Sequence, residues 1–392
     1  LHRFRDRARE IVNQLPEEQF TLLKAYTRGV NQGLDHLNAT PFEYLILQHD
    51  PVEWHEEDTI LSGFSMYIGL QYNQGERERT LGAIKALYGD DILAFLNPKG
   101  SIWDAAIDGT VNSPSPMPLL PWLPISSEAI ETNNTYVPLP TSIVTKQQNE
   151  QLPGSNNWAV SGKISQTGAA IVANDMHLGI RIPNTWFRAS FEYFDLDNNP
   201  IKVTGLTLPG TPNIIIGSNT KIAWGFTNSY GDWSDTIVLE TNQDNSEYLT
   251  PNGYIPFTEH KQIIAIKGQD AIEVTIKETI WGPVINDKDD APLLAYRWVA
   301  HDNEAANLYS SNLELATSVD QAFIIAAKSG LPAQNLVIGD QAGNIGWTIM
   351  GAIPRKDGEI GDLPTSWSNG KNNWKGYLSP AEYPKIKNPT KQ

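Results

Sequence analysis

The feature that most constrains this sequence is a change of pattern on either side of a proline-rich stretch. Before about residue 112, apolar side chains recur at helical spacing, whereas after residue 155 they fall in short strand-like runs. The stretch between them, SPSPMPLLPWLPISS, suits neither a helix nor a central strand, because proline has no backbone N–H and a fixed φ. The chain should therefore fold as a helical part and a strand-rich part.

The helical part has recognisable starting signals. Pro16, Glu17 and Glu18 predict a helix start, because proline fits the first turn and acidic groups favour the positive end of the helix dipole. Further helices are expected over about 56–74 and 80–96. The expected domains are a helical segment over 1–112, a linker or pro-segment over 113–154, and a strand-rich core over 155–392.

The strand-rich part consists of short β-branched runs bounded by glycine, asparagine or proline, beginning with NWAVSG and AAIVAND. A hairpin is expected to turn near residues 267–270, and an amphipathic helix is expected over about 318–329. Strands interrupted by a helix predict an α+β fold, in which sheets pack together and helices lie outside them.

Composition excludes several classes of function. The chain has 29 Lys and Arg against 45 Asp and Glu, a net charge of −16, so it lacks the basic face that nucleic acids and anionic membranes require. It has no cysteine, which excludes disulfides, thiolate zinc sites and cysteine catalysis. No apolar run approaches the ~18–20 residues of a membrane helix. We expect neither nucleic acid nor membrane as a partner.

The common catalytic signatures are absent: there is no P-loop, no dinucleotide-binding glycine motif after a strand, and no G-x-S-x-G elbow. The segment GSNNW stands where the linker ends and the strands begin. From its residues alone, this segment is either a plain loop-to-strand turn or the site of a serine nucleophile.

Four ordered stretches decide between these readings: SNNWAVSG, NDMHLGI, GSNTKIAWGFTNSYGDWSD and NLVIGDQAGNIGWTIMGAIPRK. Together they resemble the penicillin amidase family of N-terminal-nucleophile hydrolases, which includes cephalosporin and acyl-homoserine-lactone acylases. The resemblance spans nearly the whole chain and does not indicate a substrate. It implies a four-layer αββα sandwich preceded by a helical segment, in an internal fragment of a longer, periplasmic or secreted precursor.

The resemblance implies an enzyme that hydrolyses a small-molecule linear amide through an acyl-enzyme. In this family a zymogen cuts itself before a serine, which corresponds here to the Gly154–Ser155 bond, and the resulting α and β chains stay associated. The freed α-amine of Ser155, with a pKa near ~7.7–8, can then act as the base for its own hydroxyl. Gly154 is expected because it leaves no side chain in the way of this attack.

Two more catalytic residues follow from the resemblance. The backbone N–H of Asn228 corresponds to an oxyanion donor, and His177 corresponds to a residue that orients the serine or its amine. A strand-end asparagine and a structural histidine are the respective alternatives. The family's second oxyanion donor is expected beyond Gln392.

Calcium is the expected ion, in a structural role, and no organic cofactor is expected. Asp232-Trp233-Ser234-Asp235 resembles a stretch that binds Ca²⁺ in penicillin acylases, with Ser234 contributing its backbone carbonyl, and either Glu76 or Glu78 is expected to join it. An acidic surface turn is the alternative. The resemblance also suggests an acyl pocket, whose residues could equally be plain core: Leu178, Ile215, Ile216, Tyr67 and Leu70.

Two other functions remain open. One is an unprocessed or inactive fragment of the same fold, acting as a binding or structural module. The other is an acidic, calcium-dependent carbohydrate-binding β-protein, for which the twelve tryptophans would be suited.

Overall fold

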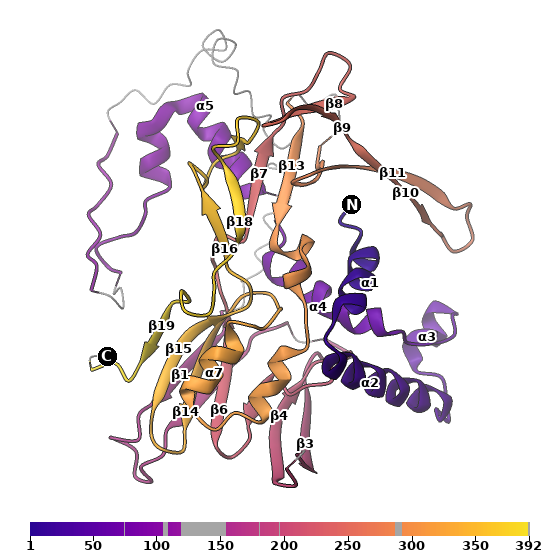
Figure 1. Cartoon of the computed structure of the whole chain (residues 1–392), viewed down its shortest axis with the longest axis vertical. Helices are drawn as coiled ribbons and strands as arrows, with labels where there is room; N and C mark the ends of the chain where they lie inside the picture. The colour runs from indigo at the N-terminus through magenta and orange to yellow at the C-terminus, as the bar shows by residue number, and fades with distance from the viewer. Residues whose placement is uncertain are drawn as a thin grey trace.

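The computed structural model describes residues 1–73, 75–104, 109–118, 154–179, 181–195, 197–286 and 292–390 (Figure 1). Most of the predicted linker, residues 119–153, lies outside the described residues, so the predicted domain limits stay a prediction. Among the described residues, every α-helix except α7 lies before residue 97 and every strand lies after residue 155.

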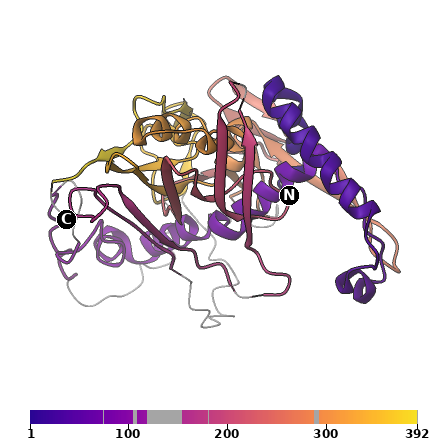
Figure 2. The same ribbon diagram turned by 90° about the horizontal axis from the view of Figure 1, so that it is seen from below.

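The helical part contains α1 (Phe4–Gln14), α2 (Glu17–Asp35), α3 (Phe42–Leu47), α4 (Glu56–Gln71) and α5 (Glu76–Leu96). Helix α2 starts directly after Pro16, as its sequence predicts. Helix α5 begins four residues earlier than expected and kinks at Gly89, whose φ of 82° suits glycine. Figure 2 shows α2 and α3 at one side of the strands. None of the described helices has the length and apolar character needed to cross a membrane.

The largest sheet has seven strands in the order β19-β15-β14-β6-β5-β4-β3, and all of its neighbouring pairs are antiparallel. One face is covered by α7 (Val319–Ala326), whose Val319 and Phe323 pack so closely on Gly346 that a Cβ there would lie 2.6 Å from both side chains. The strands are β3 (Phe187–Phe194), β4 (Pro200–Thr207), β5 (Ile216–Ser218), β6 (Ile222–Asn228), β14 (Gln334–Asp340), β15 (Ile345–Met350) and β19 (Lys385–Lys387).

The opposite face of this sheet is covered by the hairpin of β1 (Asn156–Val160) and β2 (Ile171–Asp175). Two glycines allow the close approach: a Cβ at Gly225 would lie 2.8 Å from Asn157 Oδ1, and one at Gly339 would lie 2.7 Å from Ala170 Cβ. Helix α7, the large sheet and the hairpin therefore form three successive layers. Helix and sheet are mixed, as the predicted α+β class requires.

A second group of strands carries the core on which the helical part packs. Its buried residues include Phe64 and Tyr67 of α4 and Tyr296 and Trp298 of β13. The remaining strands form small sheets. They are β7 (Ser234–Val238) between β13 (Leu294–Trp298) and β17 (Thr365–Ser366); β16 (Pro354–Asp357) with β18 (Asn373–Tyr377); β8 (Glu247–Thr250) with β9 (Gly253–Pro256); and β10 (Thr258–Ile264), β11 (Ile272–Thr279) and β12 (Gly282–Pro283), where the predicted hairpin turns after β10.

Candidate functional site

A cavity of about 870 Å³ lies between α4, the start of β1, the end of β2 and the strands β5 and β6. We call it the nucleophile cavity. All of the residues predicted for autocleavage, catalysis and acyl binding line it, although they come from widely separated parts of the chain: Gly154, Ser155, His177, Asn228, Leu178, Ile215, Ile216, Tyr67 and Leu70.

Ser155 and His177 meet because the hairpin pairs their strands. Asn156 lies opposite Asp175 in the β1–β2 register, so the residues just outside this pair are neighbours. The backbone N–H of His177 donates to Ser155 Oγ at 3.0 Å. His177 Nδ1 lies 2.8 Å from the carbonyl oxygen of Gly154, on the bond predicted to be cut.

The His177 ring also contacts Asp175, a residue that the sequence analysis missed. Nε2 of His177 lies 2.9 Å from Asp175 Oδ1. A peptide carbonyl and a carboxylate both accept hydrogen bonds, so the His177 ring lies between two acceptors. A proton on Nδ1 would be directed at the Gly154 carbonyl. The sequence signal for Asp175 was its position two residues before His177 at a strand end, because side chains two residues apart lie on the same face of a strand.

The room that glycine at position 154 would leave for the attack by Ser155 stays a prediction. Gly154 is exposed, and a Cβ built on it meets no described atom within 4 Å other than those of its chain neighbours. Ser155 is itself one of those neighbours.

Asn228 ends β6 and connects that strand to α4. Its side-chain amide donates to the carbonyl of Leu70 at 3.1 Å, and its own carbonyl accepts from Asn335 Nδ2 at 3.1 Å. These contacts hold the backbone at the cavity wall in one place. Its role as an oxyanion donor stays a prediction.

Asn174 is a second residue that the sequence analysis missed. Its Oδ1 accepts from the backbone N–H of Phe226 at 2.8 Å, and its Nδ2 donates to the carbonyls of Phe226 and Asn156 at 2.9 and 2.8 Å. It therefore fastens the hairpin that carries Ser155 onto the large sheet. A polar residue directly after the apolar start of this strand was its only sequence signal.

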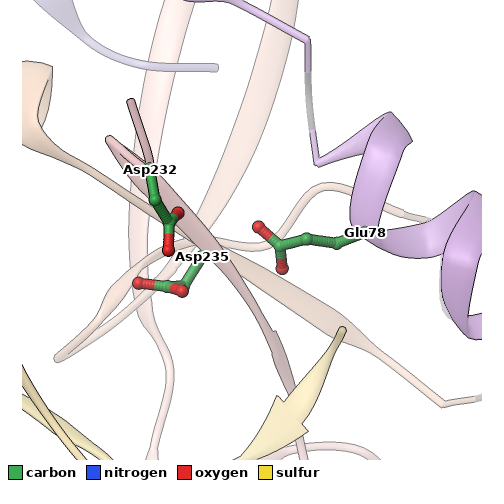
Figure 3. A group of neighbouring side chains, drawn as sticks. All are labelled: Glu78, Asp232 and Asp235. Atoms are coloured by element: carbon green, nitrogen blue, oxygen red, sulfur yellow. The ribbon is translucent and has the colours of Figure 1, made fainter. Parts of the chain in front are cut away.

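Away from the cavity, the carboxylates of Glu78, Asp232 and Asp235 gather, each offering an oxygen within 4.8 Å of the others (Figure 3). We call them the carboxylate cluster. Glu78 comes from the first turn of α5, and Asp235 from β7. Glu76 is exposed and does not belong to the cluster, so of the two predicted glutamates only Glu78 joins it. Ser234 lies in β7 opposite Trp298, and its metal role stays a prediction.

Lys356 of β16 lies among these acids, a position that no sequence motif predicts. Its Nζ is 2.7 Å from Asp232 Oδ1 and 2.9 Å from Asp235 Oδ2. Burial first, and the charge of Asp235 second, raise the pKa of Glu78 to about 8. Burial also raises the pKa of Asp235 to about 6, against the attraction of Lys356. The cluster thus has two buried acids, Glu78 and Asp235, and one exposed acid, Asp232, with an ammonium among them.

Comparison with known proteins identifies the family. The profile described as penicillin amidase matches residues 1–392. The acyl-homoserine lactone acylase QuiP of Pseudomonas aeruginosa is 26% identical over 393 residues, covering 93% of this chain and 43% of that protein. The penicillin acylase 2 proenzyme of Pseudomonas sp. strain SE83 is also 26% identical, over 96% of this chain and 47% of that protein.

A solved structure supports the same fold. The thermostable penicillin G acylase from Alcaligenes faecalis matches with a TM-score of 0.53 and 24% identity, over 60% of this chain and 42% of that chain. The chain spans less than half the length of the curated relatives named above. Because the family profile matches from the first residue to the last, the chain belongs to the penicillin amidase family.

Proposed function

We propose that this chain is the nucleophile-bearing part of an amide hydrolase that activates itself by cutting the Gly154–Ser155 bond. The observation that carries the proposal is the pair of contacts made by His177 at the wall of the cavity. Its backbone N–H binds the Ser155 hydroxyl, while its ring binds the carbonyl of Gly154, the residue that precedes that serine. One residue therefore holds both the attacking group and the group to be attacked.

In the self-cleavage step, Ser155 Oγ attacks the carbonyl carbon of Gly154. Negative charge develops on the carbonyl oxygen, which faces His177 Nδ1 at 2.8 Å, and a hydrogen-bond donor at that place stabilises the charge. The C–N bond breaks, and the hydroxyl proton ends on the released amine of Ser155. Water then hydrolyses the new ester, leaving a Gly154 carboxylate and a free serine amine.

The freed amine becomes the base of the mature enzyme. Its pKa of about 8 lies near working pH, so it can accept the proton of its own hydroxyl as that oxygen attacks an amide substrate. We propose that the backbone N–H of Asn228 donates a hydrogen bond to the oxyanion that forms when Ser155 attacks the substrate carbonyl. The contacts of Asn228 with Leu70 and Asn335, which fix this segment, support the assignment.

The chemistry of the cavity indicates the acyl group. The cavity volume of about 870 Å³ is within the ~300–1,000 Å³ usual for small-molecule sites, and the cavity lining includes Leu178, Ile215, Ile216, Tyr67 and Leu70. We therefore propose a linear amide with an apolar, aliphatic or aromatic acyl group. The names of the relatives, acyl-homoserine lactone acylase and penicillin acylase, agree with such a class.

We further propose that the two chains of the mature enzyme stay together outside the cytoplasm. Contacts between α4 and β6, such as Asn228 with Leu70, would persist after the cut. The three layers described above would become the expected four-layer αββα sandwich through a further helical layer.

Mass spectrometry of the full-length protein tests the proposal. The wild type should yield two chains, one of which begins with Ser155, and Ser155→Ala should remain uncut and inactive. Ser161→Ala, a substitution in the loop just after β1, should mature normally and serves as the control. Maturation of Ser155→Ala at the same bond would refute the scheme, and an uncut wild type would favour a binding module instead.

A further inference from the structure

The carboxylate cluster has an unusual neighbour for a site at which the sequence predicts calcium. Lys356 approaches two of its three acids, and its side chain is only 16% exposed. We propose that the ammonium of Lys356 is the resident cation of this cluster and fulfils there the structural role expected of Ca²⁺.

The position of Lys356 is fixed by its own strand pair. It lies directly opposite Trp374 in the β16–β18 register, and its Nζ lies 5.4 Å from the centre of the Trp374 ring. A cation over an indole face is attracted by the electron density of the ring. The lysine is therefore directed into the cluster by one aromatic residue and two carboxylates.

The other donors around the cluster also suit an ammonium better than a metal. Ca²⁺ prefers six to eight oxygen ligands at ~2.3–2.6 Å. Here Glu78 Oε2 accepts from the backbone N–H of Thr236 at 2.6 Å, and Asp235 Oδ2 accepts from Trp374 Nε1 at 2.5 Å. N–H groups thus engage one oxygen of each buried acid, and an ion coordinated to Asp232 and Asp235 would also face the ammonium. The carboxylates fit Ca²⁺ by type, but their surroundings do not.

With Lys356 as the cation, the contact between these helix and strand elements needs no added ion. Glu78 belongs to α5, Asp235 to β7, and Lys356 to the β16–β18 pair, so one lysine joins two strand groups beside a helix from the first hundred residues. Removing the charge would leave buried acids facing one another without a counter-ion, which is strongly unfavourable.

Thermal unfolding of the full-length protein tests this inference, independently of whether the proposed activity holds. The wild-type Tm should be the same in EDTA and in excess Ca²⁺. Lys356→Gln, which keeps much of the length but removes the charge, should lower Tm by several degrees. Lys356→Arg, which keeps the charge, should retain more of the wild-type stability than Lys356→Gln. Lys375→Gln is the matched control, since Lys375 lies beside Trp374 but is 62% exposed and pairs with Asp357.

Three results would overturn the inference. One is a wild-type Tm that falls in EDTA and recovers with Ca²⁺, which would identify a metal as the resident cation. The second is a Lys356→Gln protein as stable as the wild type, and the third is a Lys356→Arg protein no more stable than Lys356→Gln. If Lys356→Gln does not fold, the EDTA and Ca²⁺ comparison on the wild type still decides the question.

Discussion

Polar groups are used in opposite ways in two regions of this molecule. At the nucleophile cavity, the side chains of His177 and its neighbour Asp175 are 44% and 53% exposed; the His177 ring contacts the Gly154 carbonyl, and Asp175 contacts that ring. In a second region, which we call the buried junction, polar groups bind one another away from water. It comprises the two buried acids of the carboxylate cluster, Glu78 and Asp235, with Lys356 and Trp374, together with the histidine pair His2 and His301, and Tyr296 lies between these two parts.

This difference in solvent exposure indicates which region can take part in a reaction. A solvated group can exchange a partner for water at little cost, whereas a buried one left without a partner costs about 1–3 kcal/mol or more. Groups in the cavity can therefore change partners during bond cleavage, but those in the junction must keep theirs. Substitutions in the cavity should alter rate, and substitutions in the junction should alter stability.

The largest effect should come from Asp175→Asn in the cavity. Asparagine lacks the carboxylate that contacts His177 Nε2 and orients the ring against the Gly154 carbonyl, so the stabilisation of the Gly154 oxyanion should weaken and self-cleavage should slow by ~10²-fold. The Tm of the uncut protein should stay the same. Timed gel electrophoresis gives the rate, and Asp197→Asn, at an exposed site, is the control. A stability loss without a rate loss would reverse the distinction between the two regions.

Trp374→Phe should have the next largest effect, in the junction. Phenylalanine keeps a ring for Lys356 and for Arg297, whose Cζ lies 4.5 Å from the ring centre, but it cannot donate to Asp235. Losing a hydrogen bond to a buried charge should cost about 1.5–3 kcal/mol in the free energy of unfolding. Urea denaturation measures this cost. Trp103→Phe, at a residue 87% exposed, should cost nothing measurable. Slower self-cleavage in Trp374→Phe would contradict the expectation that substitutions in the junction alter stability and leave the rate unchanged.

The histidine pair predicts a smaller, pH-dependent effect. His2 Nδ1 lies 3.0 Å from His301 Nε2, and burial lowers the pKa of His2 to about 4 and that of His301 well below its ordinary value. Between pH 7 and 5 the unfolded chain therefore binds more protons than the folded chain, and this pair contributes less stability as pH falls. Its contribution is complete above the unfolded histidine pKa of about 6.5.

His301→Gln isolates that contribution from that of Asp235, whose pKa of about 6 lies in the same range. Its free energy of unfolding, measured by urea denaturation, should change less steeply between pH 7 and 5 than that of the wild type. His36→Gln, on an exposed histidine at the end of α2, should keep the wild-type slope. Equal slopes in all three proteins would show that the pair does not sense pH.

The local parts of this structure could be predicted from sequence. Pro16 and the acids after it marked the start of α2, and the short β-branched runs NWAVSG and AAIVAND marked β1 and β2. These two features depend on residues close together in the chain, where spacing and propensity act directly. The resemblance to the family, rather than local spacing, named the residues that the fold gathers around one cavity.

The approach of Glu78 to Asp235 followed from the resemblance, but the other contacts of the junction could not be predicted, because they join distant residues. Trp374 and Asp235 are 139 positions apart, and His2 and His301 are 299 apart. Lys356 in a short strand is indistinguishable by sequence from a solvated lysine. For the same reason the predicted choice between Glu76 and Glu78 stayed open until the direction of α5 against β7 was known.

The smallest effect should come from an ion pair outside both regions. Lys261 Nζ lies 2.9 Å from Glu273 Oε1 across β10 and β11, but the two side chains are 68% and 52% exposed. Water solvates both charges in the unfolded chain nearly as well, so Lys261→Ala should change the free energy of unfolding by less than about 1 kcal/mol and leave self-cleavage intact. Urea denaturation of Lys261→Ala and Trp374→Phe under the same conditions measures the two free energies of unfolding. If the two variants lost equal stability, burial would not be what separates the junction from the rest of the polar surface.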